Sequence, residues 1–135
     1  MSSANFLSST WGSRVVFLSL LLFFFTLPHT LEDFALGAPQ EAGIPAPVLA
    51  LVISILYALQ ALGLFFLGQK KRLGLFLHMG IGVFWPVASG FAQLPVILTE
   101  SPYRAGAISV LYVFGMIAVG VLIFIFSLLA LRAKA

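Results

Sequence analysis

Four long apolar segments dominate this sequence and restrict the folds that it can adopt. A helix needs about 20 mostly apolar residues to cross a bilayer, and only helices and closed barrels satisfy their backbone polar groups there. The segments cover residues 14–30, 47–67, 73–93 and 105–131, and none of them contains Asp, Glu or Lys. We therefore predict an all-α fold: an up-down antiparallel four-helix transmembrane bundle that forms one integral membrane domain over residues 1–135.

Composition excludes several other classes of protein. Hydrophobic residues make up 61% of the 135 residues and charged residues only 8%, against about 25% charged residues in soluble domains. There is no cysteine, which excludes disulfides and thiolate metal sites. The net charge of +3 and the pI of about 9.7 would suggest a nucleic-acid partner in a soluble protein, but here the basic residues act as an orientation signal. We expect the lipid bilayer as a partner and no nucleic acid.

Basic and acidic residues separate onto opposite sides of the predicted bundle. One side holds Arg14, Lys70, Lys71, Arg72, Arg132 and Lys134, and the other holds Glu32, Asp33, Glu41, Glu100 and Arg104. Because Lys and Arg in short loops favour the cytoplasmic side, we predict that both termini and the loop 69–72 lie inside (N-in, C-in), in a bacterial-type inner (plasma) membrane. Alternatively, the basic loop binds lipid headgroups or a partner. A cleaved signal peptide also has the outline of segment 14–30, but the long apolar run favours a retained span.

The two histidines lie at different depths in the predicted spans. Measured from the inner boundary of its helix, His29 lies about 22 Å up and His78 about 9 Å up, at 1.5 Å per residue. Ligands of one metal ion each lie about 2 Å from it, so the two histidines cannot share an ion or a haem within one subunit. The other polar residues fall into an inner layer, namely Ser19, Gln60 and Ser127, and an outer layer, namely Glu32, Asp33, Ser89, Gln93, Glu100, Arg104 and Tyr112.

The outer layer contains the main candidate site. His29, Glu32 and Asp33 stand at positions i, i+3 and i+4, which share one face of a helix. An imidazole beside two carboxylates suits a proton relay or a metal site with nitrogen and oxygen ligands. We therefore take these three residues, with Gln93 and Tyr112, as a candidate polar site. The first three are also candidate metal ligands, although the sequence names no cofactor.

A purely structural interpretation competes with this one. Pro28 would end the first helix, Thr30 and Asp33 would form a capping box, and Gly37 would close a short turn. Glu32 and Asp33 would then only stabilise a helix N-terminus at the lipid surface. The sequence leaves both interpretations open.

The segment His29-Thr30-Leu31-Glu32-Asp33 resembles the motif of the His-X-X-Glu-Glu family of small bacterial membrane proteins. That family is likewise a compact multi-span membrane domain with its motif near the end of the first span. Here Asp33 stands in place of the second Glu, and Asn5 is the only asparagine, so a second motif containing Asn is absent. The resemblance implies a site at residues 29–33 but no particular reaction, because the function of the family is not established.

His78 allows a different hypothesis. Gly74 precedes it by one helical turn, which resembles the small-X-X-X-His arrangement of light-harvesting polypeptides, where imidazole ligates a chlorophyll magnesium. This resemblance implies pigment or haem binding through His78. Alternatively, His78 is a buried residue that is hydrogen-bonded to Gln60 on the neighbouring helix.

Three functions follow from these observations. The first is an accessory or scaffold subunit of a larger membrane complex, which contacts other membrane subunits or copies of itself; small size and short loops motivate it. The second is a small membrane enzyme or metal-binding protein that uses His29, Glu32 and Asp33. The third is pigment or haem binding through His78. No nucleophile elbow or phosphate-binding loop is present, so we lean towards a protein that is not an enzyme.

Overall fold

The computed structural model describes residues 10–100 and 102–133, and these residues form helices and connecting turns without a strand. The helices are α1 (Thr10–Ala35), α2 (Ala38–Glu41), α3 (Ala46–Gly68), α4 (Leu73–Ala92), α5 (Leu94–Thr99) and α6 (Ala107–Arg132). Four helical segments are long and apolar enough to cross a membrane, namely Thr10–Ala35, Ala46–Gly68, Leu73–Thr99 and Ala107–Arg132. The predicted all-α fold and its four spans are therefore confirmed. Asn5 and Lys134 lie outside the described residues.

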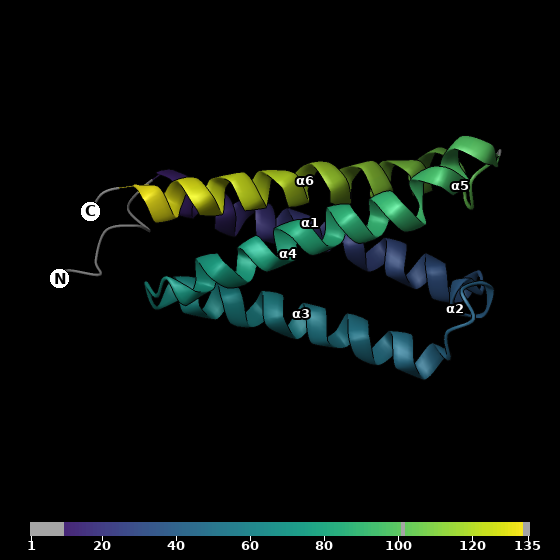
Figure 1. The fold of residues 1–135 in the computed structure, drawn as a ribbon, viewed down its shortest axis with the longest axis horizontal. Coiled ribbons are helices and arrows are strands. Elements are labelled where there is room, and N and C mark those ends of the chain that lie inside the picture. Colours follow the sequence, from purple (N-terminus) through teal and green to yellow (C-terminus); the bar gives the residue numbers. More distant parts are fainter. Residues whose placement is uncertain (1–9, 101, 134–135) are drawn as a thin grey trace.

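The charged residues mark the two ends of the bundle. The start of α1, the turn between α3 and α4, and the end of α6 lie at one end, whereas α2 and α5 lie at the other (Figure 1). The first end carries the basic loop 70–72 and is called the basic end below. The second carries Glu32, Asp33, Glu41 and Glu100, which are all the acidic residues of the chain, and is called the acidic end.

Helices α1, α4 and α6 form the centre of the molecule, and α3 packs mainly on α4. A methyl group at Gly82 of α4 would lie 2.8 Å from the carbonyl oxygen of Gly120 on α6, which is too short for a Cβ atom. A methyl group at Gly74 would likewise lie 2.7 Å from the carbonyl oxygen of Gly63 on α3. Glycine therefore lets these backbones approach closely, as is common in membrane helices. Beyond the Gly63–Gly74 contact, α3 diverges from α4 toward the acidic end (Figure 1).

The capping interpretation, in which Pro28 ends the first helix, is wrong. Helix α1 continues through Pro28 to Ala35, so Thr30 lies inside the helix and does not cap one. Its hydroxyl lies within hydrogen-bond distance, 3.2 Å, of the Tyr57 hydroxyl on α3. Proline removes only one backbone bond from a helix, and neighbouring helices and side-chain hydroxyls can compensate for this in a membrane. Gly37 does follow the helix end, with the left-handed φ of 83° that favours glycine.

The third span also extends farther than predicted. After Gln93 the chain forms α5, with Pro95 in its first turn, where the missing N–H of proline needs no partner. The helical segment therefore continues to Thr99. This extension places the end of the third span at the acidic end of the molecule (Figure 1).

Candidate functional site

His29, Glu32 and Asp33 lie together on the last turns of α1, as their spacing predicts. His29 Nδ1 lies 3.7 Å from Glu32 Oε2, and His29 Nε2 lies 3.5 Å from Asp33 Oδ2. The His29 residue is only 3% exposed. The imidazole thus lies between two carboxylates, close enough for ion pairing when it is protonated but not at hydrogen-bond distance in this arrangement.

Arg104 joins this group from the loop between α5 and α6. Its Nη2 atom lies 3.3 Å from Asp33 Oδ1, and its Nε–H donates to the Tyr103 hydroxyl at 3.0 Å. The Tyr103 hydroxyl in turn donates to Gln93 Oε1. Arg104 has a left-handed φ of 44°, which is uncommon for residues other than glycine. Its loop is therefore held in an unusual conformation that directs the guanidinium to Asp33.

The environment keeps both loop residues in their ordinary protonation states. Burial lowers the pKa of Arg104, but the hydrogen bond with Tyr103 and the negative charge of Asp33 raise it more, so the pKa lies above its usual value. Burial also raises the pKa of Tyr103, and the neighbouring guanidinium offsets only part of this effect. Arg104 thus stays a cation, and Tyr103 stays a hydrogen-bond donor to Gln93.

Glu32 is held by the start of α6. The Ser109 hydroxyl donates to Glu32 Oε1 and accepts from the Ala105 backbone N–H at 3.0 Å. A serine nucleophile usually donates to a histidine or lysine that takes its proton, but here the acceptor is a carboxylate. Ser109 is also fully buried. Its position indicates that it fixes Glu32 and links α1 to α6.

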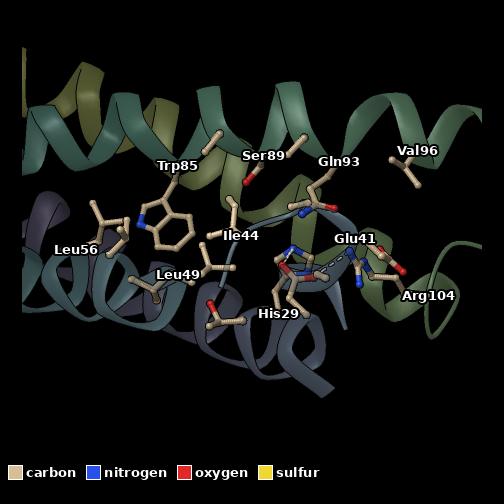
Figure 2. A pocket seen from close by; sticks show the side chains of 18 of the residues that line it. His29, Glu41, Ile44, Leu49, Leu56, Trp85, Ser89, Gln93, Val96 and Arg104 are labelled. Carbon is tan, nitrogen blue, oxygen red and sulfur yellow. Dashed lines mark ion pairs between the residues drawn. The ribbon is translucent and has the colours of Figure 1, made fainter. Parts of the chain in front are cut away.

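A cavity of about 510 Å³ opens beside this group, between α1, α3 and α4. Figure 2 shows His29, Glu41 and Arg104 at one end of it, and Leu56 and Trp85 at the other. The cavity therefore joins a charged end to an apolar interior. Its lining is His29, Thr30, Asp33, Ala38, Glu41, Ala42, Ile44, Leu49, Val52, Ile53, Leu56, Phe84, Trp85, Ala88, Ser89, Ala92, Gln93, Val96, Glu100 and Arg104.

Two buried residues in the lining of this cavity carry polar atoms without a hydrogen-bond partner among the described residues. They are His29, at both ring nitrogens, and Trp85, at Nε1. Trp85 is 7% exposed, and its indole extends from α4 toward α3 (Figure 2). A buried polar group left unpaired costs about 1–3 kcal/mol. The lining of the cavity thus includes residues with unsatisfied polar groups both at its charged end and deeper in its apolar part.

The other two residues of the predicted polar site differ in their position relative to the cavity. Gln93 lines the cavity, whereas Tyr112 is not among the described residues that line it. Within the described part of the chain, no group of three or more His, Cys, Asp or Glu residues is arranged to hold a metal ion. Arg104 places a positive charge against Asp33, which disfavours a metal cation at the same carboxylate.

His78 belongs to a separate network nearer the basic end. Its Nδ1 atom lies 2.7 Å from the Gly74 carbonyl oxygen, and its Nε2 atom lies 2.9 Å from Ser19 Oγ. Because a carbonyl only accepts, Nδ1 carries the proton, and Nε2 accepts from the Ser19 hydroxyl. Gln60 Nε2 donates to the same Oγ at 3.1 Å and to the Ser19 carbonyl at 2.8 Å. Ser19 therefore connects Gln60 and His78, in place of the direct bond of the alternative interpretation.

This network does not fit a pigment or haem. The Nε2 lone pair of His78 is used by Ser19, and the ring is fully buried. The space beside Gly74 is filled by α3, because a methyl group there would lie 2.7 Å from the Leu67 nitrogen. Ser19 precedes His29 by ten residues on α1, which is about 15 Å along a helix. The two histidines therefore lie in distinct sites.

Comparison of the chain with protein-family models, with curated proteins and with solved structures finds no match. The class of protein accordingly rests on the fold and the site. Four apolar helical spans define a small polytopic, all-helical membrane protein. Its distinguishing feature is a cavity at the acidic end that combines buried polar groups with apolar walls.

Proposed function

We propose that this protein binds an amphipathic small molecule in the cavity at its acidic end. The polar part of the ligand lies near His29 and Arg104, and the apolar part lies between α3 and α4. The observation that carries the proposal is the pair of buried polar side chains without a hydrogen-bond partner among the described residues, His29 and Trp85, in the lining of a largely apolar cavity. Its volume of about 510 Å³ lies within the 300–1,000 Å³ range of small-molecule pockets.

The walls of the cavity support entry from the bilayer. They come from two spans that diverge toward the acidic end, so the apolar part of the cavity lies between helices and not in a loop. Val52 on α3 and Phe84 on α4 both line it and are 43% and 38% exposed. An apolar chain can therefore reach the cavity sideways from the lipid without passing the charged end.

Binding fits the arrangement of the polar residues better than catalysis does. Glu32 accepts from Ser109, and Asp33 is paired with Arg104, so neither carboxylate is poised to activate a nucleophile. The site includes His29, Glu32 and Asp33, on which the resemblance to the His-X-X-Glu-Glu family depends. By the positive-inside rule, the basic end faces the cytoplasm (N-in, C-in) and the site faces the outer side of a bacterial-type plasma membrane.

Trp85 offers a direct test, since the chain has only two tryptophans. In a Trp11→Phe variant, Trp85 is the only indole, and a single-chain amphiphile with a brominated tail should quench its fluorescence by contact in vesicles of unlabelled lipid. Quenching should saturate and should be reversed by the same amphiphile without bromine. In the matched Trp85→Phe variant, only Trp11 at the basic end remains, stacked against Arg14, and no saturable quenching is expected. A Trp85 signal that rises only linearly with bromine content would contradict the proposal.

A second candidate function is an accessory or scaffold subunit, and the outward face of α4 favours it. A methyl group at Gly80 would meet no atom within 4 Å, and Phe76 and Phe84 flank this glycine on the same face and are 56% and 38% exposed. A small residue between two aromatic rings suits the approach of a helix from another subunit or a second copy. Extraction from the native membrane in mild detergent should then yield a larger complex, which a Gly80→Leu variant should release. Migration of the native protein as a lone small species would count against this function.

A further inference from the structure

The charge at the acidic end indicates what kind of polar group the cavity accepts. All four carboxylates of the chain lie there, and Arg104 is the single base among the described residues of that end. With His29 neutral, the four carboxylates and Arg104 give the acidic end a formal charge of −3. At the edge of a low-dielectric membrane domain such an excess acts over several ångströms. The site therefore repels an anionic head and attracts a cationic one.

The four carboxylates differ in whether they have a partner within the protein. Asp33 is paired with Arg104, and Glu32 accepts from Ser109. Glu41, at the end of α2, and Glu100, after α5, also line the cavity, but neither forms an ion pair with another described residue. Two exposed carboxylates thus stand at the charged end of the cavity, free to meet a ligand.

Arg104 does not offset this preference. Its guanidinium is already placed against Asp33 and donates to Tyr103, so the charge of Asp33 offsets the charge that it could present to an anionic ligand. His29 is 3% exposed, and its two nitrogens lie 3.7 and 3.5 Å from the carboxylates of Glu32 and Asp33 without a hydrogen bond to either. Its carboxylate neighbours make a polar or cationic group a better partner for this end of the cavity than an anion.

We propose that the ligand is an amphiphile with a positively charged nitrogen head, an amine or ammonium group, held between Glu41 and Glu100 while its apolar chain reaches Trp85. This inference rests on the proposed function and specifies its ligand class. An ordinary zwitterionic membrane lipid would bring a phosphate beside the same carboxylates, so a free cationic amphiphile fits the charge balance better.

The test compares brominated single-chain amphiphiles of equal length that carry trimethylammonium, phosphocholine, hydroxyl or carboxylate heads. Each is titrated into neutral phosphatidylcholine vesicles that contain the Trp11→Phe protein, and the quenching of Trp85 is followed. The trimethylammonium chain should reach half-quenching at about a fivefold lower mole fraction than the hydroxyl chain, an effect on the scale of two exposed ion pairs. The carboxylate chain should be the weakest.

Glu41→Gln/Glu100→Gln should reduce the preference for the cationic head to less than about twofold, whereas Glu41→Asp/Glu100→Asp, which keeps both charges, should retain most of it. Equal quenching by all heads would overturn the cation preference while leaving the proposed function in place. Equal quenching by the phosphocholine and trimethylammonium chains would mean that bilayer lipid fills the cavity, and would likewise overturn it. Saturable quenching by none of the chains would remove the proposed function itself.

Discussion

Arg104 is the residue whose role depends most on the fold. In the sequence it is a lone base on the acidic side, seventy-one positions after Asp33. In the structure it is the counter-ion of Asp33, and both side chains are largely buried, at 14% and 18% exposure. Removing one member of a buried ion pair leaves an uncompensated charge, which costs more than the pair itself contributes.

A substitution cycle at this pair tests that interpretation. Arg104→Gln should destabilise the protein by about 3 kcal/mol, because Asp33 loses its counter-ion. Adding Asp33→Asn should recover part of this loss, since the remaining charge is removed. Arg72→Gln, the same change at an exposed base of the basic end, should shift stability by about 0.5 kcal/mol or less. The measurement is unfolding in mixed micelles followed by circular dichroism. A double variant that is less stable than Arg104→Gln would contradict this account of the pair.

At the scale of helices, glycines decide where two spans approach and where they separate. Gly82 and Gly120 bring α4 against α6, and Gly63 and Gly74 bring α3 against α4 near the basic end. Toward the acidic end α3 diverges (Figure 1), and the cavity occupies the space that results. The shape of the site is therefore a consequence of where small residues permit close packing.

The contrast between two glycines of α4 gives a matched prediction. Gly82→Ala should destabilise the protein by about 1–3 kcal/mol, because its methyl group would collide with the backbone of α6. Gly80→Ala, on the open face of the same helix, should be neutral or stabilise by up to about 1 kcal/mol, since alanine is the better helix former. The same micelle unfolding assay compares both variants. Equal effects of the two would show that α4 and α6 are not in close contact at Gly82.

At the scale of the whole molecule, the separation of basic from acidic residues sets the expected orientation of the protein across the membrane. The chain has no cysteine, so a single introduced thiol reports the exposure of one position. Gln40 at the acidic end and Gln69 at the basic end are both exposed. In intact cells, a membrane-impermeant maleimide should label Gln40→Cys directly, but Gln69→Cys only after permeabilisation, because the basic loop favours the cytoplasm. The reverse labelling pattern would place the site on the cytoplasmic side.

Local features of the sequence predict much of this fold. The four spans follow from apolar length, and the shared face of His29, Glu32 and Asp33 follows from helical periodicity. The depth difference between His29 and His78 follows from counting residues along a helix. In contrast, the capping turn after Pro28 was a wrong expectation, because proline alone does not show whether neighbouring helices will support a continued helix. The helical continuation through α5 was missed for the same reason.

The sequence by itself determined the number of spans, their helical character, the grouping of acids against bases and the residues that share the last turns of α1. Each of these depends on composition or on the helical repeat within one segment. Only the tertiary structure decided that Arg104 pairs with Asp33, that Ser109 holds Glu32, that Ser19 joins Gln60 to His78, and that a cavity opens beside Trp85. These contacts depend on which helix faces meet and how closely, and glycines and loops far apart in the chain set that jointly.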